Sequence, residues 1–168
     1  MVTIRNLFLG ILTLCCGTSF CQTQGKSEPP QFSDFAAGDL VAGAPVHPVL
    51  ATKLQRKFKT VIVTEAAKGP NFAGSYRIVH WGCGSDCIVF VVADLKTGKV
   101  YDPPFESLLL IDFRQSGKEA LRKGLIYRQD SRMLIVDGCP TEHCGTFYYE
   151  WFGTGFKLLR SDVVEENK

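Results

Sequence analysis

Four cysteines are the residues of this chain whose type and spacing are best suited to chemistry. They form two close pairs, Cys83 with Cys87 and Cys139 with Cys144, at C-x3-C and C-x4-C spacing. The other three of the seven cysteines lie within residues 1–21, the predicted signal peptide discussed below. The even number that remains in an exported domain predicts two disulfides. Four cysteines allow three connectivities. The short spacings favour the two local bridges, and the crossed pairings are the alternative.

The same four cysteines could instead bind a zinc ion, because zinc sites space their paired cysteines two to four residues apart. Reduced or redox-active thiols are a third interpretation, although neither pair has the C-x-x-C spacing of thioredoxin-like catalysts. Export favours disulfides over both alternatives, since an oxidising compartment joins neighbouring thiols.

Polar side chains next to the cysteines are the second candidate group. His80, Asp86 and His143, together with Glu142, could converge if the two cysteine loops met in space, and they would then suit a metal ion or a hydrolase. However, the chain has no H-E-x-x-H or H-x-H spacing, no G-x-S-x-G and no glycine-rich phosphate loop. The sequence therefore assigns no catalytic residue, no metal ligand and no cofactor.

Aromatic side chains are the third candidate group, as a binding surface. Strand alternation puts Phe147, Tyr149 and Trp151 on one face of a single strand, which also carries Tyr148 and Phe152 on its other face. One face must belong to the core, and a surplus left exposed would suit a peptide, a glycan or another protein. The predicted binding residues are Tyr76, His80, Trp81, Asp86, His143, Tyr149 and Trp151.

The amino terminus predicts export. Arg5 precedes an apolar run over 7–20, which as a helix would reach only about 21 Å against a bilayer core of about 30 Å. A short basic start, a short apolar run and a small-residue exit are typical of a cleaved signal peptide, here over 1–21. A lipoprotein anchor is the alternative, but no cysteine in this segment follows Gly, Ala or Ser. We expect a periplasmic or secreted protein.

Composition restricts the partners and the number of domains. The chain has 168 residues with 19 basic and 17 acidic side chains, and removal of Arg5 with the signal peptide leaves a nearly neutral protein. Such a balance gives no electrostatic footprint for nucleic acid or an anionic membrane surface. We expect a leader over 22–31, a single domain over 32–162 without a transmembrane helix, and a charged tail over 163–168. An irregular surface strap is expected over 36–48.

One helix and several hairpins are expected to position these residues. Apolar residues at three- and four-residue steps predict an amphipathic helix over 48–68, ended by Gly69-Pro70, although the β-branched run over 60–64 could form a short strand. The strand predictions cover 76–81, 108–113 and three hairpins, at 88–101, 125–137 and 147–159.

Hairpins in series predict antiparallel pairing, because parallel neighbours need long crossovers. The predicted fold is therefore α+β: a single antiparallel meander sheet of about six to eight strands, with one amphipathic helix packed on a face and two disulfides as staples. Residues 88–93 are apolar throughout, which predicts a central strand covered on both faces.

The run NFAGSYRIVHWGCGSDC over 71–87, followed by ADLKTGKVY over 93–101, resembles a family of small exported bacterial proteins of uncharacterised function. The resemblance is best over 69–101 and implies an exported bacterial domain. It brings no established activity, so no catalytic residue follows from it. The leading hypothesis is a non-enzymatic exported domain that binds an envelope protein, a peptide or a glycan, and an inhibitor-like protein is one concrete version of it. The alternative is a metal-binding protein or hydrolase that uses His80, Asp86 and His143.

Overall fold

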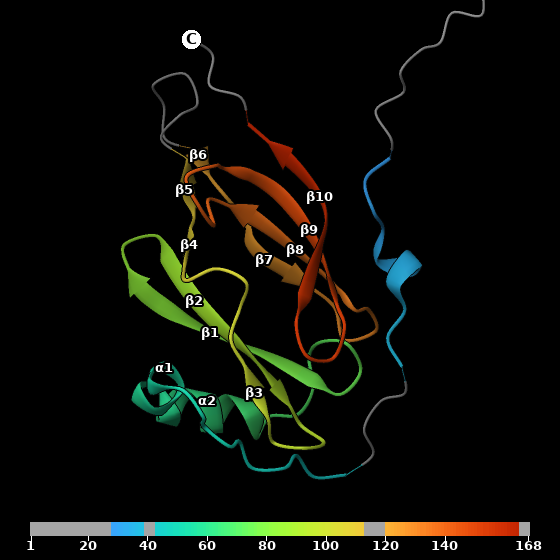
Figure 1. Cartoon of the computed structure of the whole chain (residues 1–168), viewed down its shortest axis with the longest axis vertical. Helices are drawn as coiled ribbons and strands as arrows, with labels where there is room; N and C mark the ends of the chain where they lie inside the picture. The colour runs from blue at the N-terminus through green and yellow to red at the C-terminus, as the bar shows by residue number, and fades with distance from the viewer. Residues whose placement is uncertain (1–27, 39–42, 113–119, 165–168) are drawn as a thin grey trace, which may run out of the picture.

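The computed structural model of the chain describes residues 28–38, 43–112 and 120–164 (Figure 1). The predicted signal peptide and most of the predicted leader lie outside these residues. The helical segments are η1 (Phe32–Phe35, a 3-10 turn), α1 (Lys53–Lys57) and α2 (Lys59–Ala66). The strands are β1 (Tyr76–Gly84), β2 (Cys87–Asp94), β3 (Val100–Tyr101), β4 (Leu108–Leu109), β5 (Ile111–Asp112), β6 (Ala120–Leu121), β7 (Gly124–Tyr127), β8 (Met133–Gly138), β9 (Gly145–Trp151) and β10 (Phe156–Val163).

The strands pair antiparallel, as predicted, but they form two four-stranded sheets instead of one. The first sheet has the order β1-β2-β3, with β4 also paired to β2, and the second has the order β10-β9-β8-β7. Strands β5 and β6 form a small separate pair. The prediction of a single sheet is wrong because alternation along a strand shows which side chains are buried, not which other strand covers them. The three predicted hairpins are confirmed as β2–β3, β7–β8 and β9–β10.

Aromatic side chains fill the space between the two sheets. The ring of Trp151 lies 4.8 Å from that of Phe156 and 5.3 Å from that of Tyr76, measured between centroids. Phe90 from β2 meets Phe156 from β10 at 6.2 Å. Trp151 is 1% exposed and Phe90 is fully buried. Full burial of one large apolar side chain contributes roughly 1.5–3 kcal/mol, so this aromatic core is the main link between the sheets.

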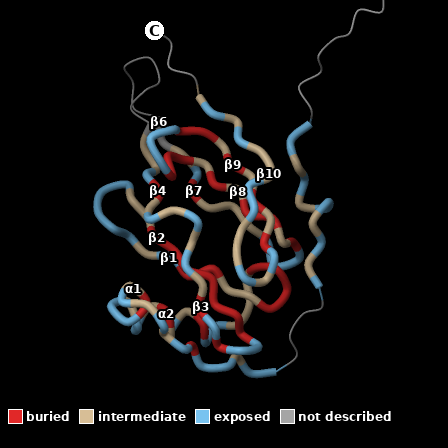
Figure 2. Tube along the Cα trace, in the orientation of Figure 1, coloured by how far each residue is buried: buried red, intermediate tan, exposed pale blue. Residues whose placement is uncertain are grey.

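Helix α2 covers the other face of the first sheet. Ile62 and Ala66 of α2 form a second buried cluster with Val79, Val91 and Ala93. Strand β2 is therefore covered on both faces, as predicted for the apolar run, and Figure 2 shows it as one of the most continuously buried segments. The molecule has three layers, with α2, the first sheet and the second sheet stacked from bottom to top in Figure 1.

The predicted helix over 48–68 is divided into α1 and α2 at Phe58. The backbone of Phe58 leaves the helical region (φ −104°, ψ 26°), and its ring stacks on Trp81 of β1 at 4.5 Å. Helix α1 begins at a capping box formed by Thr52 and Gln55. The buried amide of Gln55 also donates to the carboxylate of Asp102 at 2.8 Å, which fixes α1 beside β3. The β-branched run over 60–64 is helical, and within it Ile62 is buried against the sheet.

The segment before the helices lies along the outside of the strands. The Ser131 hydroxyl donates to the carbonyl oxygens of Phe32 and Phe35 at 2.9 and 3.0 Å, and the amide of Arg132 donates to the carbonyl oxygen of Phe35 at 2.7 Å. Within the described part of the strap predicted over 36–48, the amides of Ala37 and Val46 donate to the carbonyls of Asp130 and Leu95, both at 2.9 Å. No helix in the described ranges is long and apolar enough to cross a bilayer.

Candidate functional site

The first cysteine loop is the tip of the β1–β2 hairpin. The two strands pair in register down to Gly82 and Ile88, and a register shift then brings Gly84 opposite Cys87. The disulfide joins Cys83 to Cys87, as predicted for the local pairing. Residues 82–86 are all exposed, and the tip projects at the left of Figure 1, where Figure 2 shows it in pale blue.

The second cysteine loop joins β8 to β9 and is closed by the other local disulfide, Cys139–Cys144. A pair of glycines, Gly138 and Gly145, stands opposite each other at its base. A Cβ atom on Gly138 would lie 2.5 Å from the carbonyl oxygen of Leu109, and one on Gly145 would collide with the β10 backbone. Both positions therefore require glycine so that neighbouring strands can approach. Each cysteine of this loop is buried.

Strand β4 lies between the two loops. Leu109 stands opposite Cys87 on one side and opposite Cys139 on the other. Its amide donates to the Cys139 carbonyl at 3.2 Å and its carbonyl accepts from the Cys139 amide at 2.9 Å. On the other side, the amide of Leu110 donates to the Asp86 carbonyl at 2.7 Å. The two cysteine loops therefore meet through one strand, which also links the two sheets.

The side chains of residues that face each other in adjacent strands project to the same face. Cys87, Leu109 and Cys139 therefore form one row across three strands, and Leu109 in its centre is 44% exposed. We call the two disulfide-closed loops together with Leu109 the cysteine face; residues 141–143 are the exposed part of the second loop. Its backbone is hydrogen-bonded on both sides of β4, so the position of Leu109 is set by the sheet and not by a mobile loop.

The predicted aromatic binding residues do not lie on the cysteine face. Tyr149 and Trp151 are 9% and 1% exposed and belong to the core between the sheets, and Tyr76 packs against Trp151. Burial raises the pKa of Tyr149, and burial together with Asp94 raises the pKa of Tyr76. Side chains packed in this way cannot form a surface for a partner. Trp81 is half-buried by its stacking on Phe58.

The predicted polar residues are exposed but do not assemble into a site. His80, Asp86 and His143 all lie at the surface, and the nearest carboxylate to His143 is that of its neighbour Glu142, at 3.7 Å. Within the described ranges, no three His, Cys, Asp or Glu side chains are arranged so that they could hold a metal ion. The loops meet, as the convergence hypothesis required, but their polar side chains do not converge.

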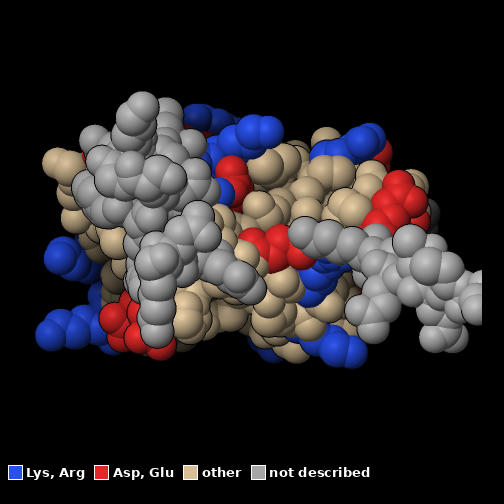
Figure 3. Space-filling view, turned by 90° about the horizontal axis from the view of Figure 1, so that it is seen from above, with Lys and Arg blue, Asp and Glu red and all other residues tan. Residues whose placement is uncertain are grey.

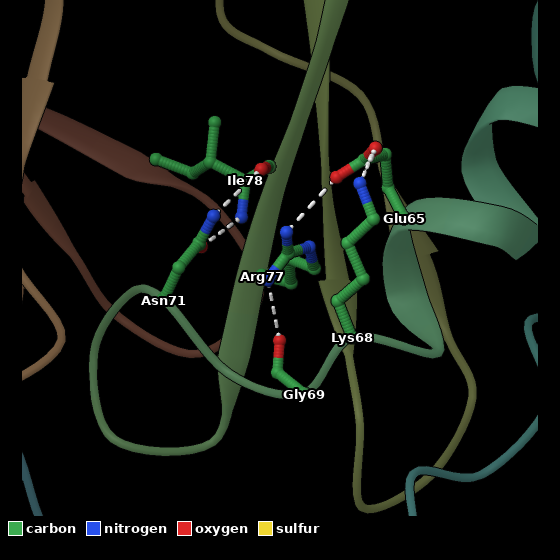
Figure 4. Close-up of polar contacts among 6 residues, drawn as sticks. All are labelled: Glu65, Lys68, Gly69, Asn71, Arg77 and Ile78. Carbon is green, nitrogen blue, oxygen red and sulfur yellow. Dashed lines mark hydrogen bonds and ion pairs between the residues drawn. The ribbon is translucent and has the colours of Figure 1, made fainter.

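A charged cluster near the start of β1, at the end of the strand away from the cysteine loop, connects α2 to the first sheet (Figure 4). The Arg77 guanidinium donates to the Glu65 carboxylate at 2.9 Å and to the carbonyl of Gly69 at 2.8 Å. Lys68 also pairs with Glu65. Hydrogen bonds from Lys68 and Arg77 lower the pKa of Glu65. Asn71 pairs through its side chain with both backbone groups of Ile78. All these contacts are internal, so the cluster stabilises the fold.

Two ion pairs lie on the outside of the second sheet. Arg132 contacts Glu150 at 2.5 Å, and Arg160 contacts Asp162 at 2.8 Å. In the view from above in Figure 3, the described basic and acidic side chains lie beside one another over this end of the molecule. The described part of this surface thus alternates in sign.

Sequence reasoning missed Leu109 and the two glycines. The glycines could have been found, because glycine directly precedes Cys139 and directly follows Cys144. Leu109 gave no such indication, since it lies in the run Leu108-Leu109-Leu110, which predicts a buried strand. The predicted strand over 108–113 is in fact interrupted between β4 and β5, and Phe113 lies outside the described residues.

Comparisons with known proteins found no matching family model, no similar curated protein and no similar solved structure.

Proposed function

We propose that this protein is an exported, non-enzymatic domain that binds a peptide or protein partner of the cell envelope through the cysteine face. The observation that carries the proposal is the row formed by Cys87, Leu109 and Cys139, in which an exposed leucine is held between two disulfide-closed loops. A single exposed leucine is ordinary in a folded protein. A leucine held between two disulfide-closed loops, however, is a preorganised contact point.

Preorganisation is the physical reason for favouring this surface. Binding is opposed by the loss of side-chain and loop freedom at the interface, and a surface that is already ordered loses less. Here each loop is closed by its own disulfide, and Leu109 is hydrogen-bonded through its backbone to Cys139. An apolar side chain with half-buried sulfur beside it would supply the water-excluded centre of such an interface.

Two disulfides fit a protein of an oxidising compartment outside the cytoplasm. The apolar amino-terminal run and the resemblance to exported bacterial proteins support export through a cleaved signal peptide. The partner would then be an envelope protein or an exported peptide. An inhibitor-like action on that partner is one specific form of the proposal.

A matched pair of leucines tests the proposal. Leu109 and Leu158 are 44% and 48% exposed, but Leu158 lies on β10, away from the cysteine loops. A photoreactive benzoylphenylalanine would be introduced at either position, and the purified proteins would be irradiated in an envelope extract. We expect a discrete crosslinked protein with the probe at 109 and none at 158. Absence of an adduct at 109, or the same adduct at both positions, would contradict the proposal. Near-wild-type thermal unfolding of both variants is the control for folding.

A further inference from the structure

The two disulfides differ in how far solvent reaches them. Cys83 is exposed and Cys87 is half-buried, whereas Cys139 and Cys144 are 6% and 4% exposed. A thiolate opens a disulfide by attacking one of its sulfur atoms, so the rate depends on access to that sulfur. The first disulfide is therefore the one that a thiol in solution can reach.

The backbone of the first loop also differs from that of the second. Asp86 has a φ of 51°, in the left-handed region that disfavours residues other than glycine, and Gly84 has a φ of 145°. Within the second loop, no residue over 139–144 has a positive φ. Opening of the first disulfide would therefore release a constrained turn, whereas the second disulfide closes a turn of ordinary conformation.

The rest of the hairpin does not depend on the first disulfide. Strands β1 and β2 are paired from Tyr76 opposite Asp94 to Gly82 opposite Ile88, and the Asp86 carbonyl is held by the Leu110 amide. Opening the bridge would thus change the tip of the hairpin and leave the three layers of the domain intact.

We propose that the Cys83–Cys87 disulfide is a thiol–disulfide exchange site that a dithiol reductant opens in the folded protein, whereas Cys139–Cys144 is a structural disulfide. This inference rests on the exposure of the cysteine residues and on the backbone of the loop. It does not depend on whether the cysteine face binds a partner.

The exchange proceeds by two attacks on sulfur. A thiolate of the reductant attacks Sγ of Cys83, which belongs to the more exposed residue, and forms a mixed disulfide while the bond between the two Sγ atoms breaks. The electron pair leaves on Sγ of Cys87, which takes a proton from solvent. The second thiolate of the reductant then attacks the reductant's own sulfur in the mixed disulfide, and Cys83 leaves as a thiolate that also takes a proton from solvent. One dithiol is oxidised to a disulfide, and one protein disulfide is reduced to two thiols.

Timed reduction and alkylation tests the proposal, because trypsin separates the two pairs. Cleavage after Lys and Arg places Cys83 and Cys87 in the peptide 78–96, and Cys139 and Cys144 in the peptide 133–157. The oxidised protein would be treated with dithiothreitol without denaturant, quenched at intervals with N-ethylmaleimide, digested and weighed by mass spectrometry. We expect the peptide 78–96 to gain two alkyl groups at least about tenfold faster than the peptide 133–157, since access limits the second pair.

Two further measurements make the result specific. Glutathione, in place of the dithiol, should leave a mixed disulfide on Cys83, located by fragmentation of the peptide 78–96. In guanidinium chloride the two peptides should react at similar rates, because the fold no longer covers the second pair. Equal rates in the native protein, or faster opening of Cys139–Cys144, would overturn the proposal. An adduct on Cys87 alone would overturn the assigned point of attack, and a rate difference that persists in denaturant would overturn exposure as its cause.

Discussion

The Cys83–Cys87 loop and the Cys139–Cys144 loop are both short disulfide-closed turns between antiparallel strands, yet Cys83 is exposed and Cys87 half-buried, whereas Cys139 and Cys144 are both buried. Their lengths differ by one residue, so loop length does not explain the difference. The difference comes from the surroundings of the loops. The cysteines of the second loop are enclosed by β4 and by the end of β10, whereas the first loop projects beyond the rest of the first sheet.

The glycines beside the cysteines account for this contrast. A Cβ atom would meet backbone at Gly138 and at Gly145, but it would meet nothing within 4 Å at Gly84 and only an ordinary contact at Gly82. Glycine therefore serves close approach of strands at the second loop and turn geometry at the first. The same pairing of Gly with Cys thus supports a packed junction in the second loop and a free tip in the first.

The largest expected effect is on stability when each disulfide is removed. By loop-closure entropy, either short loop contributes on the order of 2 kcal/mol to the free energy of unfolding. Cys139→Ser with Cys144→Ser also buries two hydroxyls, so we expect a total loss of about 3–4 kcal/mol. Cys83→Ser with Cys87→Ser should lose no more than about 2 kcal/mol. Chemical denaturation of both variants checks this, and a larger loss for the exposed pair would contradict the comparison.

A methyl group added at the base of the second loop should have the next largest effect. Gly138→Ala would force its Cβ against the Leu109 carbonyl, and overpacking of this kind destabilises by about 1–3 kcal/mol. Gly82→Ala is the matched control beside the first loop and should stay within about 0.5 kcal/mol of wild type. Displacement of β4 should also speed the reduction of Cys139–Cys144. Equal stability of the two variants would show that the glycine pair does not enclose the loop.

Asp86 offers a smaller test, restricted to the exposed tip. Because its φ is 51°, Asp86→Ala should destabilise by about 1 kcal/mol or less, and Asp86→Gly should be neutral or slightly stabilising. Ser85→Ala in the same turn is the control, since Ser85 has no positive φ. Thermal unfolding measures all three variants. Equal losses for alanine and glycine at 86 would rule out backbone conformation as the cause.

The smallest expected effect is the loss of stability at acidic pH that comes from Glu65, which links α2 to the first sheet. Hydrogen bonds from Lys68 and Arg77 lower the pKa of Glu65 in the folded protein, so its stabilising contribution is complete above the ordinary glutamate pKa of about 4.3. That contribution is lost as the pH falls further through the folded-state value. Glu65→Gln should remove this part of the pH dependence, as measured by unfolding between neutral and acidic pH. An unchanged acid limb would contradict the role of the cluster on β1.

Local patterns were sufficient to predict several elements. The hairpins around 94–99, 128–132 and 152–155 follow from turn residues between apolar runs, and both disulfides follow from short spacing. The central strand β2 follows from its unbroken apolar run. Each of these features depends on residues that are near in the sequence, so their chemistry can be read directly.

Features that depend on distant residues could not be predicted in the same way. The division into two sheets depends on which strands face Trp151, and the break at Phe58 depends on its partner Trp81. The exposure of Leu109 depends on pairing with Cys87 and Cys139 at once. For β9, alternation correctly placed Phe147, Tyr149 and Trp151 on one face. That this face belongs to the core depends on the first sheet, which packs against it.

The hydrogen bonds from Ser131 to Phe32 and Phe35 have a consequence for the order in which the chain folds. They join residues 99 and 96 positions apart, and contacts so distant in sequence form late because a long loop must first close. The β7–β8 hairpin that carries Ser131 must therefore exist before the amino-terminal segment can attach to it. Although residues 32–35 are made before every strand of the domain, we expect them to be among the last to reach their native place.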